Sequence, residues 1–132
     1  MRGHANEAVK KLYDTVWRGQ KIGFEKIRAG VPTADVHKAV QKFFVQQGYK
    51  TGRRDGRMEG FFHGTGHGLG LDIHEAPRIG ATSAGKLRPS HVVTVEPGLY
   101  YPEIGGVRLE DVALVTGNGA KNLTRFEKVL EI

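Results

Sequence analysis

Hydrophobic residues near the start of the chain recur at the spacing of an α-helix. The apolar positions at intervals of three and four are Val9, Leu12, Tyr13, Val16 and Trp17, and Ile27 extends the pattern. Asn6 is suited to cap the N-terminus of such a helix, and Glu7 suits its first turn. The helix should end near Ala29 and Gly30, because Pro32 disfavours helical backbone at the residue before it.

A second helical pattern follows at once. Its apolar positions are Val36, Val40, Phe43 and Phe44. We expect Thr33 to cap its N-terminus and Gly48 to cap its C-terminus, since these residue types are favoured at those positions. Both patterns have the periodicity of ordinary core helices, so neither helix is assigned any chemistry.

The remainder of the chain has the pattern of loops and strands. Residues 50–59 are polar and include two glycines, which predicts an exposed loop. Runs typical of strands cover residues 91–96, 106–115 and 128–132. The order of these elements predicts an α+β fold in which two helices pack on one face of a curved antiparallel sheet.

Length and composition exclude several classes of protein. The 132 residues suffice for one domain, and an apolar fraction of 39% with a charged fraction of 26% excludes a disordered or collagen-like chain. No apolar run approaches the roughly 18 residues of a membrane span, and the N-terminus lacks the apolar stretch of a secretory signal. We therefore expect no membrane partner and a cytoplasmic location. Cysteine is absent, which excludes disulfides, thiolate metal ligands and a cysteine nucleophile.

The formal charge of +6 raises the question of a nucleic-acid partner. However, the basic residues are scattered, and the densest cluster, Arg53, Arg54 and Arg57, has no interleaved aromatic residues. A solvated basic face explains this pattern better, and we expect no nucleic-acid partner.

Three of the six histidines, His63, His67 and His74, lie within twelve residues. Glycines at 64, 66, 68 and 70 make a helix very unfavourable here, so His63 and His67 are expected on one face of an extended segment. The glycines also indicate that another backbone or a ligand approaches closely. His74 would point the other way unless a bend at 68–70 returns it.

Two glutamates occur where a carboxylate is unusual. Glu96 ends an apolar run before a Pro-Gly turn, which would direct its carboxylate into a cleft. Glu110 and Arg108 would share one face of the strand predicted at 106–115, and charge in an apolar strand is costly unless it is paired or bound to a metal. His67, Glu96 and Glu110 are therefore candidate ligands for Mn, Fe, Co or Zn.

For these histidines and charged residues, a purely structural role is an open alternative to metal binding. Taken singly, each histidine is more often a hydrogen-bonded structural or surface residue than a ligand. Arg108 and Glu110 could also pair with each other or with Asp111. The other three histidines have no partners in the sequence pattern and are expected at the surface; they are His4, His37 and His91.

Three motifs carry a resemblance to a known family. Residues 63–77, HGTGHGLGLDIHEAP, closely resemble the signature of proline-specific metallopeptidases, the Xaa-Pro aminopeptidases and Xaa-Pro dipeptidases (prolidases) of the methionine aminopeptidase superfamily. VTVEPGLY at 93–100 and GVRLED at 106–111 resemble two further family motifs, in the family's order. Residues 12–48 also resemble its helices. The resemblance implies part of the pita-bread fold.

The resemblance implies a hydrolase that cleaves Xaa-Pro bonds in proline-containing peptides. Two divalent ions, commonly Mn or Co with Zn or Fe as alternatives, would share a bridging hydroxide that attacks the scissile carbonyl. His67 and Glu96 would bind one ion and Glu110 would bridge both. Whether the enzyme is an aminopeptidase or a dipeptidase stays open.

The same resemblance assigns roles to three further side chains. His63 would assist proton transfer and hold substrate, and His74 would stabilise the oxyanion of the tetrahedral intermediate. Arg108 would orient the metal ligands through a contact of its own.

The family's two remaining ligands are aspartates that precede the helices found here. We therefore expect residues 1–132 to be the C-terminal portion of a pita-bread catalytic domain, with a partial metal site and weak or no activity in isolation. A missing N-terminal half or a second copy in a homodimer would complete it. The alternative is a catalytically inactive pita-bread module that binds peptide or protein.

Overall fold

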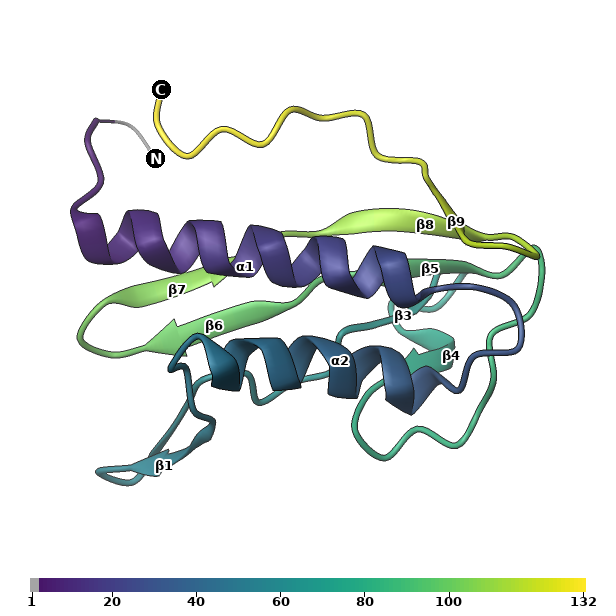
Figure 1. Cartoon of the computed structure of the whole chain (residues 1–132), viewed down its shortest axis with the longest axis horizontal. Coiled ribbons are helices and arrows are strands. Elements are labelled where there is room, and N and C mark those ends of the chain that lie inside the picture. The colour runs from purple at the N-terminus through teal and green to yellow at the C-terminus, as the bar shows by residue number, and fades with distance from the viewer. Residues whose placement is uncertain (1–2) are drawn as a thin grey trace.

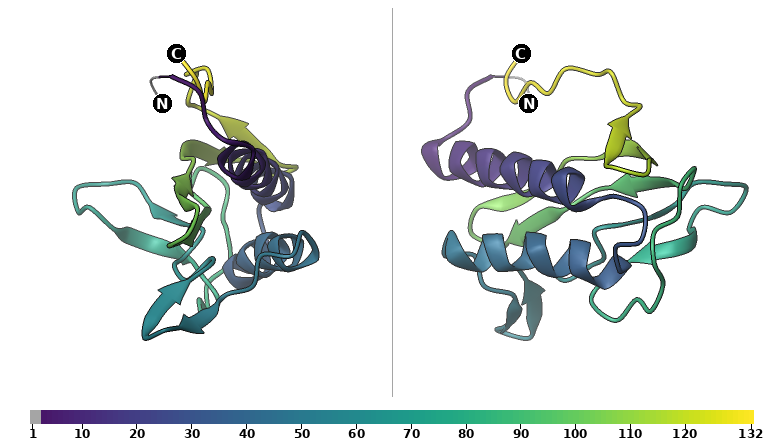
Figure 2. Two further views of the ribbon diagram at one scale, coloured as in Figure 1. Left: turned by 90° about the vertical axis from the view of Figure 1, so that its left-hand side faces the viewer. Right: turned by 45° about the vertical axis from the view of Figure 1, so that its right-hand side comes forward.

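Two helices form one layer of the molecule and antiparallel strands form the other (Figures 1 and 2). The structure is a computed structural model, and it describes residues 3–132. The elements are α1 Glu7–Lys26, α2 Thr33–Gln46, β1 Gly52–Arg54, β2 Arg57–Glu59, β3 Gly66–Gly68, β4 Glu75–Ile79, β5 Val92–Val95, β6 Gly98–Tyr101, β7 Gly105–Arg108, β8 Asp111–Val115 and β9 Ala120–Asn122. The predicted α+β class, with two helices on antiparallel strands, is confirmed.

The strands are divided among three antiparallel sheets. The largest has the order β4-β3-β5-β8-β9, and β1-β2 and β6-β7 are two-stranded. The single strand expected over 106–115 is wrong, because residues 109 and 110 separate β7 from β8 and the two strands pair with different neighbours. The division places residue 110 in a link between two sheets.

The helix α1 begins as its sequence predicts. The side chain of Asn6 caps it by accepting a hydrogen bond from the amide of Val9 at 2.9 Å. The helix ends at Lys26, a few residues earlier than predicted. The backbone of Ile27 is extended, which ends the helix, and its fully buried side chain packs into the core.

The start of α2 differs from its prediction. Pro32 occupies the capping position, and Thr33 is the first helical residue. The hydroxyl of Thr33 donates to the carbonyl of Gly85 at 3.1 Å, so a tertiary contact replaces the expected cap. The predicted stop is confirmed: Gly48 follows the last turn with φ of +89°, a conformation that suits glycine.

Two segments expected from their patterns have another structure. Residues 50–59 include the hairpin of β1 and β2, whose turn residues Asp55 and Gly56 both have positive φ, as Asp-Gly hairpin turns require. Its side chains are almost all exposed, so no alternation marked it as strand. Residues 128–132 form no strand. This segment runs along α1 (Figure 1), and the amide of Gly3 donates to Ile132 at 3.2 Å.

The core consists of two apolar clusters between the layers. One joins the start of α2 to the large sheet, and the other joins α1 and α2 to β6. Gly19 lets the helices approach, since a Cβ there would overlap the ring of Phe44. Within residues 3–132, neither helix combines the length and apolar character that crossing a membrane requires.

Glycine at position 66 is expected to be essential for stability. A Cβ at Gly66 would overlap the carbonyl oxygen of Thr94, which is backbone and cannot turn away. Gly66→Ala should lower the free energy of unfolding by about 2–3 kcal/mol, the usual cost of overpacking, as measured by urea denaturation. The control Gly117→Ala adds a Cβ that meets nothing within 4 Å. Equal stability of the two variants would contradict the close approach of β3 and β5.

Candidate active site

His67 lies in the short strand β3, between two glycines that no larger residue could replace without a clash. Its neighbours Gly66 and Gly68 have no room for a side chain, because the carbonyls of Thr94 and Ala76 lie against them from opposite sides. The strand β3 therefore fits between β4 and β5. The predicted close approach of another backbone to this glycine-rich segment is confirmed.

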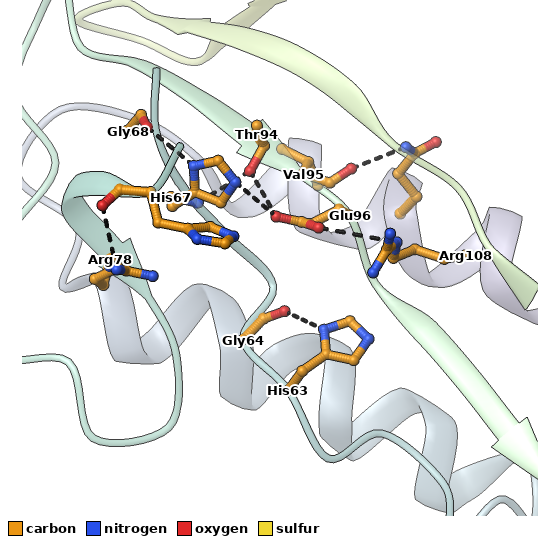
Figure 3. Close-up of polar contacts among 11 residues, drawn as sticks. His63, Gly64, His67, Gly68, Arg78, Thr94, Val95, Glu96 and Arg108 are labelled. Atoms are coloured by element: carbon orange, nitrogen blue, oxygen red, sulfur yellow. Dashed lines mark hydrogen bonds and ion pairs between the residues drawn. The ribbon is translucent and has the colours of Figure 1, made fainter. Parts of the chain in front are cut away.

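Glu96 directly follows β5 and faces His67 (Figure 3). Nε2 of His67 lies 3.1 Å from Oε1 of Glu96, and the two side chains are only 12% and 14% exposed. The backbone around Glu96 is held from two elements. Its amide donates to the carbonyl of Thr65 at 2.7 Å, and buried Gln20 of α1 donates to the carbonyl of Val95 at 3.0 Å.

Hydrogen bonding defines the state of the His67 ring. Nδ1 lies 3.0 Å from the carbonyl oxygen of Gly68, which can only accept, so Nδ1 carries a proton. In the neutral ring Nε2 then has a lone pair that faces a carboxylate oxygen of Glu96. Two acceptors at 3.1 Å need a proton or a metal ion between them: a proton carried by Nε2 or by the Glu96 carboxyl, or a metal ion bound by both.

The other two clustered histidines line one cleft together with His67 and Glu96. A bend over residues 69–74 returns His74 to His67, and their rings meet edge to face with centroids 4.6 Å apart. The ring of His63 packs edge-on against Phe61 and Tyr100. Its Nδ1 lies 2.7 Å from the carbonyl of Gly64, and its Nε2 is buried with no hydrogen-bond partner among the described residues.

Arg108 and Glu110 occupy different elements at the edge of the cleft. Arg108 ends β7, and its Nε lies 4.0 Å from Oε2 of Glu96. Glu110, in the link between β7 and β8, lines an open hollow of about 720 Å³ together with His67, His74 and Glu96. The expectation that Arg108 and Glu110 share one strand face is wrong. Arg108 is paired with Glu96.

Asp111 has a separate role behind this cleft. It is buried at the start of β8, and Nζ of Lys128 lies 2.6 Å and 2.7 Å from its two carboxylate oxygens. Asn122 donates to the same carboxylate at 2.9 Å. The C-terminal segment is thus anchored beside Glu110.

The side chains of His67, Glu96 and Glu110 are of the types that bind divalent ions, but only those of His67 and Glu96 are in contact with each other. One imidazole and carboxylate oxygens are suitable ligands for Mn, Co, Zn or Fe. The 3.1 Å between His67 and Glu96 matches two neighbouring ligands of one ion, each about 2.1 Å from it. Among residues 3–132, however, no three His, Asp or Glu side chains lie close enough together to hold a metal ion.

His37 was wrongly expected at the surface. It is 4% exposed, its ring stacks on Phe61 at 4.8 Å, and its Nδ1 lies 3.0 Å from the hydroxyl of Thr65. Burial, and then the nearby His63, lower its pKa. The sequence signal was its place on the apolar face of α2, three residues before Val40. Of the other two histidines expected at the surface, His4 is exposed and His91 is half-buried.

Thr94 was also missed as a site residue. Thr94 lies two residues before Glu96, so the two side chains point to the same side of the chain. Its hydroxyl contacts both His67 and Glu96. The available signal in the sequence was a polar residue in an apolar strand, two positions before a candidate ligand.

Comparison with known proteins identifies the family of the chain. The chain belongs to metallopeptidase family M24, whose family model matches residues 1–117. It is 38% identical to the Xaa-Pro dipeptidase of Pyrococcus horikoshii over 97% of its own length and 34% of that protein. The chain spans about a third of the length of the curated relatives it matches.

Solved structures show the same fold. The Xaa-Pro dipeptidase from Bacillus anthracis superposes with a TM-score of 0.87 at 37% identity, over 98% of this chain and 35% of that one. The X-Pro aminopeptidase from Thermotoga maritima superposes with a TM-score of 0.86 at 28% identity, over 98% and 35% of the two chains. The chain thus has part of the pita-bread fold.

Burial of His37 should make the stability of the fold depend on pH. An unfolded histidine binds a proton near pH 6.5, whereas folded His37 resists protonation because its pKa is lowered. The unfolded state therefore binds more protons just below this pH, and stability should fall as the pH drops from about 7.5 to about 5.5.

Urea unfolding at the two pH values measures this effect. The fall should be smaller in His37→Gln, which has no ring to protonate, than in the wild type. The exposed His4→Gln variant serves as the control and should lose as much stability as the wild type. A fall in His37→Gln as large as in the wild type would contradict the assignment.

Proposed function

We propose that this chain carries one side of a metal-dependent peptidase site that hydrolyses Xaa-Pro peptide bonds. The observation that carries the proposal is the His67–Glu96 pair, two acceptors placed so that one metal ion could be bound by both, at the base of a cleft lined by two further histidines. Relatives named Xaa-Pro dipeptidase and X-Pro aminopeptidase support the substrate class. The proposal covers both dipeptidase and aminopeptidase activity.

In this proposal His67, Glu96 and Glu110 would hold divalent metal ions. Mn or Co is favoured, with Zn or Fe as alternatives, since the nitrogen and oxygen donors accept all four. When bound, such ions polarise the scissile carbonyl and lower the pKa of the attacking water. The remaining ligands come from outside residues 1–132, supplied by an N-terminal half or by a second copy.

The other cleft residues act on the peptide. His74 is exposed beside His67, where its ring can donate a hydrogen bond to the scissile carbonyl oxygen as negative charge develops there. His63 lines the same cleft, where it would hold the substrate and assist proton transfer. Arg108 holds the carboxylate of Glu96 in orientation.

A second candidate is a pita-bread module that binds peptide or protein without catalysis. It is favoured by the finding that no three potential ligands converge within the described residues. The two candidates differ in whether the His67–Glu96 pair binds a divalent ion.

Titration of the chain with Mn²⁺ tests the proposal. We expect at most one ion per chain, bound weakly, and at least tenfold weaker binding by His67→Ala, which removes the ligand nitrogen. His4→Ala, far from the cleft, should bind like the wild type. Cleavage of an Xaa-Pro dipeptide by the chain alone should be slow.

Two results would count against parts of this proposal. Absence of Mn²⁺ binding would reject the metal site and favour the peptide-binding module. Two ions per chain with rapid turnover would show that residues 1–132 need no further ligands.

A further inference from the structure

The Thr94 hydroxyl contacts both residues of the His67–Glu96 pair. Its oxygen is 3.0 Å from the backbone nitrogen of His67 and 3.0 Å from Oε1 of Glu96 (Figure 3). Thr94 is 2% exposed, so no solvent competes for either contact. One side chain of β5 therefore contacts β3 and the residue after β5.

The direction of each hydrogen bond follows from chemistry. The amide of His67 can only donate and the carboxylate of Glu96 can only accept. A hydroxyl has one proton and two lone pairs, so Thr94 accepts from His67 and donates to Glu96 at the same time. A side chain without the hydroxyl would leave a donor and an acceptor unpaired at a buried place.

These bonds matter because the amide of His67 has its partner in this hydroxyl, whereas flanking residues pair backbone to backbone, Thr65 with Glu96 and Leu69 with Val92. In the part of the chain that the structure describes, one Cα pair joins β3 to β5, Gly68 with Val93, and the register of β3 against β4 shifts between Gly66 and Gly68. The Thr94 side chain takes the place of a backbone partner for the amide of His67.

The same hydroxyl determines how Glu96 presents its carboxylate. Oε1 accepts from Thr94 and faces Nε2 of His67, while Oε2 is turned toward Arg108 at 4.0 Å. With the backbone amide of Glu96 held by Thr65, the side chain is restrained at both ends.

We infer that Thr94 is a positioning residue that sets the His67 ring and the Glu96 carboxylate at the spacing needed to share one cation. The inference rests on the proposed function and adds to it a residue that determines cation affinity without contacting the ion. It concerns the hydroxyl alone, because serine offers the same donor and acceptor.

Four forms of the full chain test the inference, each checked for folding by circular dichroism. Thr94→Val removes the hydroxyl and keeps the shape, and Thr94→Ser keeps the hydroxyl. Thr15→Val is the matched control, because Thr15 is also buried and its hydroxyl donates to the carbonyl of Lys11 within α1. The wild type completes the set.

Two readouts are measured: the Mn²⁺ dissociation constant, and the hydrogen exchange of the His67 amide without metal. Thr94→Val should bind Mn²⁺ about 10- to 100-fold more weakly, the usual effect of losing a residue that orients ligands. Its His67 amide should exchange about tenfold faster, as expected for one lost hydrogen bond. Thr94→Ser and Thr15→Val should stay within about threefold of the wild type in both readouts.

The outcomes separate this inference from the proposed function. If the wild type binds Mn²⁺ and Thr94→Val binds it equally well, the inference is overturned and the proposed function stands. Weak binding by folded Thr94→Ser would also overturn it, even if Thr94→Val does not fold. If the wild type binds no Mn²⁺, the proposed function fails. Exchange of the His67 amide then decides for or against the role of Thr94.

Discussion

The close approach of β3 to β5 is the constraint on which the candidate site depends. Gly66 permits this approach, because a Cβ there would overlap the carbonyl oxygen of Thr94 in β5. Gly68 permits the matching approach of β4, whose Ala76 carbonyl lies against it on the other side of His67. The approach brings the amide of His67 to the Thr94 hydroxyl and the carbonyl of Thr65 to the amide of Glu96. Histidine and carboxylate come into contact as a consequence of backbone packing.

The rest of the fold holds this contact rigid from several directions. From α1, Gln20 reaches the last carbonyl of β5. From α2, buried His37 holds the Thr65 hydroxyl and stacks on Phe61, which in turn packs against His63. Helices without chemistry of their own thus determine where the cleft residues lie, because short strands have few ladder bonds with which to do so.

The C-terminal segment supports the opposite edge of the cleft. The ion pair of half-buried Lys128 with buried Asp111 fixes the start of β8, immediately after Glu110, and Asn122 satisfies a further lone pair of the carboxylate. A buried carboxylate left without these partners would be strongly destabilising. The pair therefore ties the position of Glu110 to a segment that has no regular structure and borders α1.

The sequence by itself determined the two helices, the strand before Glu96, the family and several residues of the cleft, among them His63, His67, His74 and Glu96. These depend on periodicity, on capping and on local motifs, which are readable along the chain. Tertiary structure alone decided that Arg108 pairs with Glu96, that His37 stacks on Phe61 and that Thr94 joins His67 to Glu96. It also divided 106–115 between two sheets, because pairing with β6 and β5 turns the chain at residue 110. Contacts between residues far apart in sequence leave no periodic signal, since each depends on how separate elements pack.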